Sequence, residues 1–289
     1  MSRWIKQDGQ LVRLPGSTRY VSAETPFEAR EGDYFIRDGW TLVYNNGSWE
    51  TAGPMVFPVR AVSEALDGPE VQDSWDVAIP SGVQVGDLLL FFTYHRANLT
   101  APAGLTLEVT ASQIVDTIDQ RATVHSKVAD ADDLSSGSFT FTQSDSSARG
   151  GTQIVAVRSS IGEAEVEDTD TSTLELVSGS VPVNHPVPGF VLPSSDEDGT
   201  RLVLTYITCA YNLAPGTWEW TDQRWDMFSW QPGSGIAGDR IWFGARPLTA
   251  GEDSREHRQA GRPLARHDYN SNHGGVGVSV MLKAVPPAE

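Results

Sequence analysis

The sequence predicts an all-β protein built of packed sheets, and three observations lead to that fold class. From about residue 56 onward, candidate strands recur every 8–15 residues and are separated by turns rich in glycine and proline. The segment SFTFTQ at 138–143 alternates strictly, so Phe139 and Phe141 face one side of a strand. No window of 12 residues carries the 3.6-residue apolar stripe of a helix. These patterns favour sheets packed face to face in a jelly-roll-like β-sandwich.

Residues 1–55 are predicted to form a small β-meander that is separate from the sandwich. Asp38-Gly39 and Asn46-Gly47 are hairpin signals, because these residue types tolerate the positive φ angles of type I′ turns. About 25 leading residues show little periodicity, and we expect them to form an arm extended against a partner surface. Residues of high β-propensity would supply a small core: Tyr34, Ile36, Trp40, Leu42, Tyr44 and Trp49.

The range 56–289 is predicted to hold the β-sandwich region. The expected strands in its first half are 56–62, 75–79, 87–95, 105–110, 121–128, 138–142 and 153–158. Those in its second half are 174–177, 190–192, 201–209, 217–221, 240–245 and 277–284. One helical turn at most fits between 128 and 138. The acidic runs at 130–133, 163–170 and 196–199 are expected to be solvated turns, since none has EF-hand spacing.

The same strand pattern occurs twice, at approximately 75–160 and 188–285. Three blocks align in the same order, which indicates a duplicated fold-level unit. The sequence leaves open whether each half closes its own sandwich or both contribute strands to one. The aligned positions are Leu88, Leu90, Asn98, Leu99, Ala101 and Pro102 with Leu202, Leu204, Asn212, Leu213, Ala214 and Pro215, then Lys127 and Ala131 with Arg246 and Ala250, and finally Gly150 and Gly151 with Gly274 and Gly275.

Composition narrows the classes of partner. The net charge of −17 argues against nucleic acid and against anionic membrane surfaces, both of which require clustered basic residues. Cys209 is the single cysteine, so no intrachain disulfide is possible, and we expect it to pack in an apolar strand. The N-terminus lacks the apolar region of a secretory signal, and the longest apolar run, 88–92, is too short to cross a bilayer. We therefore expect assembly in a reducing cytoplasm and no membrane insertion.

The strongest candidate for a binding site is a cluster of four tryptophans, Trp218, Trp220, Trp225 and Trp230, within 13 residues. Exposed tryptophans can stack against sugar rings or anchor a protein interface, and the alternative is that they fill a core or a subunit contact. Tyr211 and Arg224 are the expected polar companions. The aligned first-half segment at 105–109 has no tryptophan, so the shared fold does not require the cluster.

Catalytic and metal-binding patterns are not found in the sequence. Gly233-Ser234-Gly235 lacks the G-x-S-x-G spacing of a nucleophile elbow. His257, His267 and His273 have spacings that match no compact zinc motif. We therefore predict that the chain is not an enzyme and that it has no catalytic residues, no metal site and no cofactor.

Five blocks follow one another in the order VGDLLLFFTYH from Val85, APAGLT from Ala101, HSKVADADD from His125, SFTFTQSDSS from Ser138 and GTQIVAVR from Gly151. This order resembles a β-sandwich module of phage and prophage structural proteins, and the resemblance covers roughly residues 75–285. The module usually has tryptophan where this chain has Leu105, and Trp218 restores it in the second half. Residues 32–40 are also similar to small anchoring modules of virion fibres.

The resemblance implies a virion protein of the tail fibre, spike or head fibre type, assembled in the host cytoplasm. Residues 1–55 would attach to the particle, and the sandwich would contact a host-surface glycan or neighbouring virion proteins. By analogy, a homotrimer is the favoured assembly. The alternatives are a purely structural head-decoration or tail connector protein, with the tryptophans buried between subunits, and a glycan depolymerase.

Overall fold

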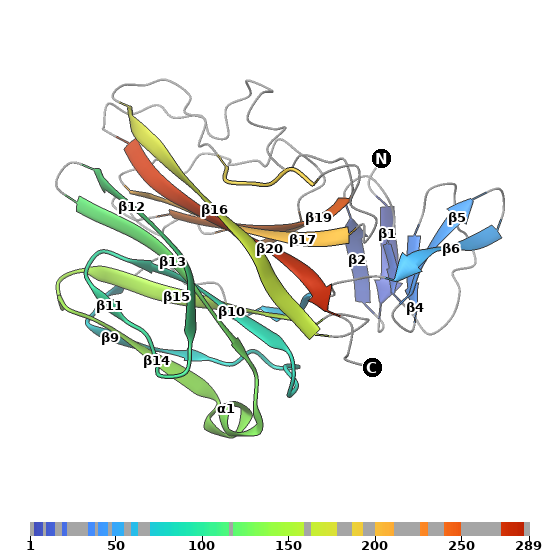
Figure 1. Cartoon of the computed structure of the whole chain (residues 1–289), viewed down its shortest axis with the longest axis horizontal. Helices are drawn as coiled ribbons and strands as arrows, with labels where there is room; N and C mark the ends of the chain where they lie inside the picture. The colour runs from blue at the N-terminus through green and yellow to red at the C-terminus, as the bar shows by residue number, and fades with distance from the viewer. Residues whose placement is uncertain are drawn as a thin grey trace.

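The fold is all-β, as predicted, in the computed structural model (Figure 1). The structure describes the backbone of residues 3–7, 10–14, 19–21, 34–37, 40–45, 48–54, 59–62, 70–115, 118–158, 163–177, 187–192, 200–210, 226–230, 240–249 and 273–285. It describes the side chains of 71–114, 119–158, 163–173, 187–192, 201–208, 243–245, 248 and 275–283. Five sheets and one short helix, α1 (Ala131–Ser136), are present within these ranges.

Two small sheets occupy the N-terminal part of the described chain. They comprise β1 (Arg3–Gln7) with β2 (Gln10–Leu14), and β3 (Arg19–Val21), β4 (Tyr34–Arg37), β5 (Trp40–Asn45) and β6 (Ser48–Pro54) in that order. Arg37 lies opposite Trp40 and Asn45 opposite Ser48, which confirms both predicted hairpins. The β1–β2 pair shows that the leading residues are not extended throughout, because the chain folds back on itself there. The boundary near residue 55 stays a prediction.

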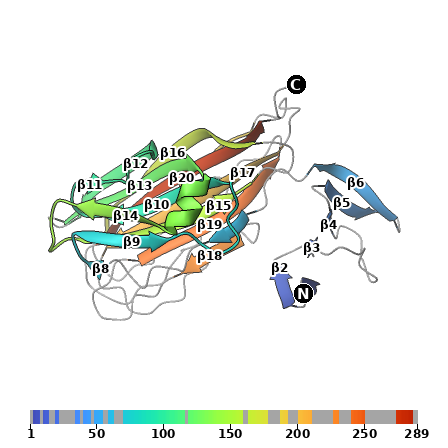
Figure 2. The same ribbon diagram turned by 90° about the horizontal axis from the view of Figure 1, so that it is seen from below.

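Three further sheets form stacked layers (Figures 1 and 2). The middle layer has the order β12 (Thr106–Val115), β13 (Ile118–Val128), β10 (Leu88–His95), β15 (Arg149–Val157) and β7 (Val59–Val62), with β8 (Glu70–Val71) also paired to β15. One outer layer has the order β18 (Asp226–Trp230), β19 (Arg240–Thr249), β17 (Thr200–Ala210), β20 (His273–Val285) and β16 (Glu163–Val177). The other outer layer has the order β11 (Leu99–Thr100), β14 (Ser138–Gln143) and β9 (Ser74–Ala78).

The two larger sheets repeat the same strand order, and their ladders define which residues are equivalent. His95 lies between Arg121 and Gly150, whereas Cys209 lies between Arg240 and Gly275. The first two aligned blocks therefore agree with the ladders at Leu88, Leu90 and Lys127, while their positions 212–215 and 250 lie outside the described residues. The third block was aligned one residue out of register, because Gly150 is equivalent to Gly275 and not to Gly274. Adjacent glycines carry no side chains that could have marked the register in the sequence.

A β-bulge also recurs at the same place in the two sheets. In β12, Glu108 is the extra residue between Leu107, which faces His125, and Val109, which faces Val124. In β18 the same shift occurs between Met227 and Ser229, which face Gly244 and Phe243. A shared irregularity of the ladder supports a common unit more specifically than strand order does.

The two repeats pack face to face, which answers the question that the sequence left open. Phe92 of the middle sheet approaches Tyr206 and Phe243 of the second sheet, with ring centroids 5.6 and 4.7 Å apart. The opposite face of the middle sheet packs under β9, β11 and β14. That second core contains Trp75, Leu89, Phe91, Phe139, Phe141 and Ile154. The first repeat thus closes its own sandwich and shares its central sheet with the second repeat.

Most expected strands of the first half are confirmed, but one acidic segment corrects the prediction. Residues 163–170 belong to the edge strand β16 and are not a solvated turn. Their burial alternates, since Ala164 is buried between exposed Glu163 and Glu165. An edge strand can carry charge on its solvent-facing side and still pair with its neighbour. The run at 130–133 begins α1, where Asp130 caps the helix, and the expected strand 217–221 and the run 196–199 lie outside the described residues.

Replacing Gly150 by alanine is expected to destabilise the fold by about 1–3 kcal/mol through overpacking. An added Cβ would lie 2.7 Å from Cη2 and Cζ3 of Trp75. That ring cannot easily move, because its Nε1 donates to Thr152 Oγ1 at 3.0 Å and it stacks on Phe141. Chemical denaturation of Gly150→Ala in the native and Trp75→Phe backgrounds measures the effect. An equal cost in both backgrounds would rule out the clash, since phenylalanine lacks the two clashing atoms.

Candidate functional site

Of the predicted tryptophan cluster, the structure describes the backbone of Trp230. Trp218, Trp220, Trp225, Tyr211 and Arg224 lie outside the described residues. Trp230 is the last residue of β18, and its backbone pairs with that of Trp242 in β19. Of the three histidines considered above, His257 and His267 lie outside the described residues, and His273 is placed as the first residue of β20. The predicted ligand site therefore stays a prediction.

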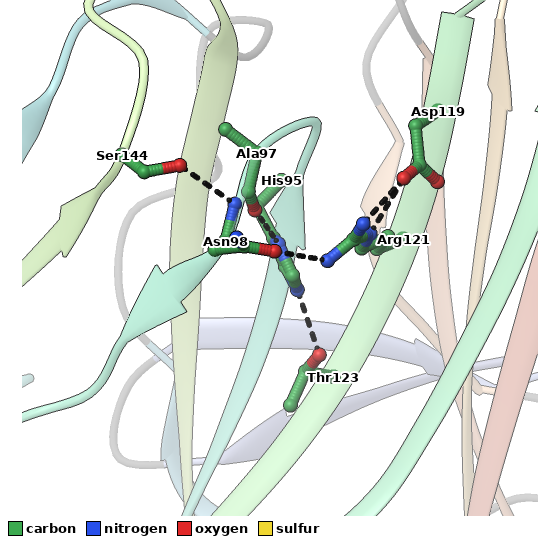
Figure 3. Close-up of polar contacts among 7 residues, drawn as sticks. All are labelled: His95, Ala97, Asn98, Asp119, Arg121, Thr123 and Ser144. Carbon is green, nitrogen blue, oxygen red and sulfur yellow. Dashed lines mark hydrogen bonds and ion pairs between the residues drawn. The ribbon is translucent and has the colours of Figure 1, made fainter.

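A polar group that sequence reasoning missed lies at the end of the middle sheet where β10 stops. We call it the loop-end cluster, and it consists of His95, Ala97, Asn98, Asp119, Arg121, Thr123 and Ser144 (Figure 3). His95 ends β10, Asn98 precedes β11, and the next three residues of the set belong to β13. The cluster thus joins the turn after β10 to the β12–β13 hairpin and to the outer sheet of β11, β14 and β9.

His95 is the buried centre of the loop-end cluster, with 3 % of its surface exposed. Its Nδ1 lies 2.7 Å from the carbonyl oxygen of Ala97, and its Nε2 lies 2.8 Å from Thr123 Oγ1. Because a carbonyl only accepts, Nδ1 carries the proton and Nε2 accepts from the hydroxyl. Burial lowers the pKa of His95 to about 4, although the bond to Ala97 acts in the opposite direction. The ring is therefore neutral at pH 7.

Arg121 forms the half-exposed rim of the loop-end cluster. Its Nε donates to Asp119 Oδ2 at 2.9 Å, and its Nη1 donates to Asn98 Oδ1 at 2.9 Å. The hydrogen bond to Asp119 raises the pKa of Arg121 further above its ordinary value. The backbone N–H of Asn98 donates to Ser144 Oγ at 3.2 Å, which ties the turn to the chain after β14.

This arrangement can hold a turn in place and present polar groups to solvent. His95 is buried and both of its ring nitrogens bond within the fold, so its contacts stabilise the turn after β10. Among the described residues, no group of three or more His, Cys, Asp or Glu side chains could hold a metal ion. The signal in the sequence was a polar stretch, HRAN at 95–98, directly after a continuous apolar strand.

The second repeat carries different chemistry at the equivalent positions. Thr123 pairs with Thr93 and Thr110 in the first sheet, and Trp242 pairs with Ile207 and Trp230 in the second. Trp242 and Trp230 are therefore the register equivalents of Thr123 and Thr110. Thr123, which bonds to His95, and Thr110, whose Oγ1 lies 3.4 Å from that of Thr123, are thus replaced by two tryptophans in the second repeat.

The chain matches no known family model, no curated protein and no solved structure. Among the described residues, none of the helical structure is long and apolar enough to cross a membrane.

Proposed function

We propose that this chain is a non-enzymatic component of a phage virion, of the fibre or spike type. Its N-terminal part attaches to the particle, and its stacked sheets contact a host-surface glycan or neighbouring virion proteins. Assembly as a homotrimer in the host cytoplasm forms part of the proposal.

The observation that carries the proposal is the convergence of the two repeats at one end of the stacked layers. Gln113, near the end of β12, accepts a hydrogen bond from the Gly275 backbone N–H at 3.2 Å. Gly275 pairs with Cys209, close to the point where the chain leaves β17 toward the tryptophan-rich range 217–230. The chain therefore leaves β17 at the same end of the stacked layers as the loop-end cluster. Binding surfaces are commonly built from loops that a rigid β scaffold gathers at one end.

One observation favours the alternative of a purely structural virion protein. Ile207 lies opposite Trp242 and is only 2 % exposed. Ile207 and Val203 point to the same face of the second sheet, because alternate residues of a strand share a face. Val203 is also buried, and it packs in one cluster with Phe190 and Leu192. This face is therefore covered at those points, and tryptophans that cover it would be core residues or subunit contacts.

We expect the double variant Trp218→Ala/Trp220→Ala to lose at least about tenfold in affinity for glycan, because stacking on tryptophan contributes over about 1 kcal/mol at well-packed contacts. The probe is a printed array of bacterial capsular and lipopolysaccharide glycans, followed by titration of the strongest ligand. Trp75→Phe is the matched control, since Trp75 is 7 % exposed in another core and its loss should leave binding unchanged.

Two outcomes separate the alternatives. If the native chain binds no glycan on the array and its tryptophan emission is blue and resistant to iodide, the purely structural assignment replaces the glycan contact. If the double variant binds as tightly as the native chain, the glycan site lies away from residues 217–221.

A further inference from the structure

The two repeats share a second bulge. It lies in the edge strand that pairs with β15 in the first repeat and with β20 in the second. In the first repeat, Ala156 and Val157 of β15 face Ala61 and Val59, so Arg60 is the extra residue of β7. In the second repeat, Met281 and Leu282 of β20 face Asp168 and Val166, so Glu167 is the extra residue of β16.

The two bulges occupy equivalent places in the two repeats. Val157 and Leu282 lie opposite Leu88 and Leu202, the matched residues of the two central strands. Arg60 and Glu167 are therefore equivalent residues of opposite charge.

The residues at the start of the two central strands, β10 and β17, also have opposite charges. Asp87 and Arg201 directly precede Leu88 and Leu202, so they too are equivalent. Arg201 is 8 % exposed; its Nη2 donates to Glu167 Oε1 at 3.1 Å, and its Nε donates to the other carboxylate oxygen. Asp87 is fully buried, its Oδ2 accepts from the Gln84 backbone N–H at 2.8 Å, and Arg158 Nη1 lies 3.7 Å from Oδ1.

We propose that Arg60 and Asp87 are matched positions of opposite charge, as Glu167 and Arg201 are, and that the opposite polarity of the two sets decides which edge strand joins which sheet. If β16 took the place of β7 beside β15, Glu167 would face the buried carboxylate of Asp87. If β7 took the place of β16 beside β20, Arg60 would face Arg201. Each exchange would place a like charge beside a buried one, since Asp87 is 0 % and Arg201 8 % exposed, and such contacts are unfavourable.

The order of the strands along the chain favours a wrong pairing of β16 with β15, which the charges would have to prevent. Only residues 158–162 separate β15 from β16, so a β15–β16 hairpin would form by closing a short loop, which costs little entropy and is fast. The observed partner of β16 is β20, more than one hundred residues away at several positions, for example Glu163 with Val285. Val59 and Val166 flank the bulges equivalently, so apolar packing at that position does not distinguish the two edge strands.

The interaction of the charges at positions 60 and 87 is tested by comparing Arg60→Glu with Arg60→Gln in the native and Asp87→Asn backgrounds. Asparagine keeps an acceptor for the Gln84 N–H and removes the charge. In the native background we expect the unfolding equilibrium constant to rise about tenfold more for Arg60→Glu than for Arg60→Gln, and in the Asp87→Asn background we expect the difference to disappear. The reference for these effects is the same comparison of Glu167→Arg with Glu167→Gln, with and without Arg201→Gln. It serves as a reference because the contact between Glu167 and Arg201 is observed directly.

Equal effects of glutamate and glutamine at position 60, or a difference that persists with Asp87→Asn, would overturn the Arg60–Asp87 pair. If Arg60→Glu does not fold, the milder cycle of Arg60→Gln with Asp87→Asn decides. In that cycle, the pair predicts a smaller effect of Arg60→Gln once Asp87 is neutral, and an unchanged effect contradicts it.

The choice of edge strand is tested by disulfide trapping in a Cys209→Ser background. Cysteines replace Val157 and Val166, which would face each other only in a β15–β16 hairpin. With native charges we expect no cross-link after refolding under oxidising conditions, and with Glu167→Arg added we expect a cross-linked fraction, detected by non-reducing peptide mapping. A cross-link that is equal in both chains, or absent from both, would refute the charge-based choice.

Discussion

Replacing Phe92 by alanine is expected to destabilise the protein by about 3–5 kcal/mol, the range typical of a buried phenylalanine. Phe92 is fully buried, and its ring lies between the two larger sheets, close to Tyr206 and Phe243 of the other repeat. The substitution therefore leaves a cavity in the layer that both repeats share. Urea denaturation followed by far-ultraviolet circular dichroism measures the loss.

Leu107→Ala is the matched control for the effect of Phe92→Ala. Leu107 lies in the same sheet but is 58 % exposed, so its truncation should change stability by less than about 0.5 kcal/mol. Because Phe92 joins the repeats, the sheets should unfold in one transition that shifts as a whole. Two separate transitions, of which only one moves in Phe92→Ala, would show that the repeats fold independently and that their shared layer contributes little.

Acidification from pH 6.5 to pH 4 is expected to remove about 3 kcal/mol of stability through His95 alone. Burial lowers the pKa of His95 from 6.5 to about 4, so the unfolded chain takes up the proton before the folded chain does. The stability that the neutral ring contributes is complete above pH 6.5 and is lost as the pH falls toward 4. Below pH 4 both states bind the proton, and no further loss arises from this residue.

His95→Gln should flatten that part of the stability profile, which equilibrium denaturation at a series of pH values measures. His125 needs its own control, His125→Gln, because burial also lowers the pKa of this histidine. Hydrogen bonds lower the pKa values of Asp130 and Asp145 below their ordinary value, so the stability that these carboxylates contribute is lost only at lower pH. A slope between pH 4 and 6.5 that is unchanged in His95→Gln would contradict the burial of a neutral ring.

Much of the first repeat could be predicted because its strands carry local signals. The continuous apolar run at 88–92 is buried on both faces, and SFTFTQ alternates as a strand with one buried face should. The strand at 163–170 was missed because its acidic residues resemble a turn when they are considered locally. Their counter-charges come from distant strands, as in the contact of Glu165 with Lys283 at 2.8 Å.

The loop-end cluster could not be predicted from spacing in the sequence. His95 and Thr123 are 28 residues apart, and their contact depends on the ladder that places β10 beside β13. The tryptophan cluster shows the opposite limitation. Its composition was evident, but the expected strand 217–221 lies outside the described residues and stays a prediction, and only β18, from Asp226, is seen to pair with β19.

The all-β class, the two N-terminal hairpins and the existence of a repeat could be predicted from the chain alone, because periodicity, turn residues and duplicated blocks are local properties. The folded arrangement was needed to show that the repeats pack face to face, that Gly150 corresponds to Gly275, and that Arg60 and Glu167 occupy equivalent bulges of opposite charge. Register and sheet stacking depend on side chains that meet from distant parts of the chain, and a linear pattern does not record those meetings.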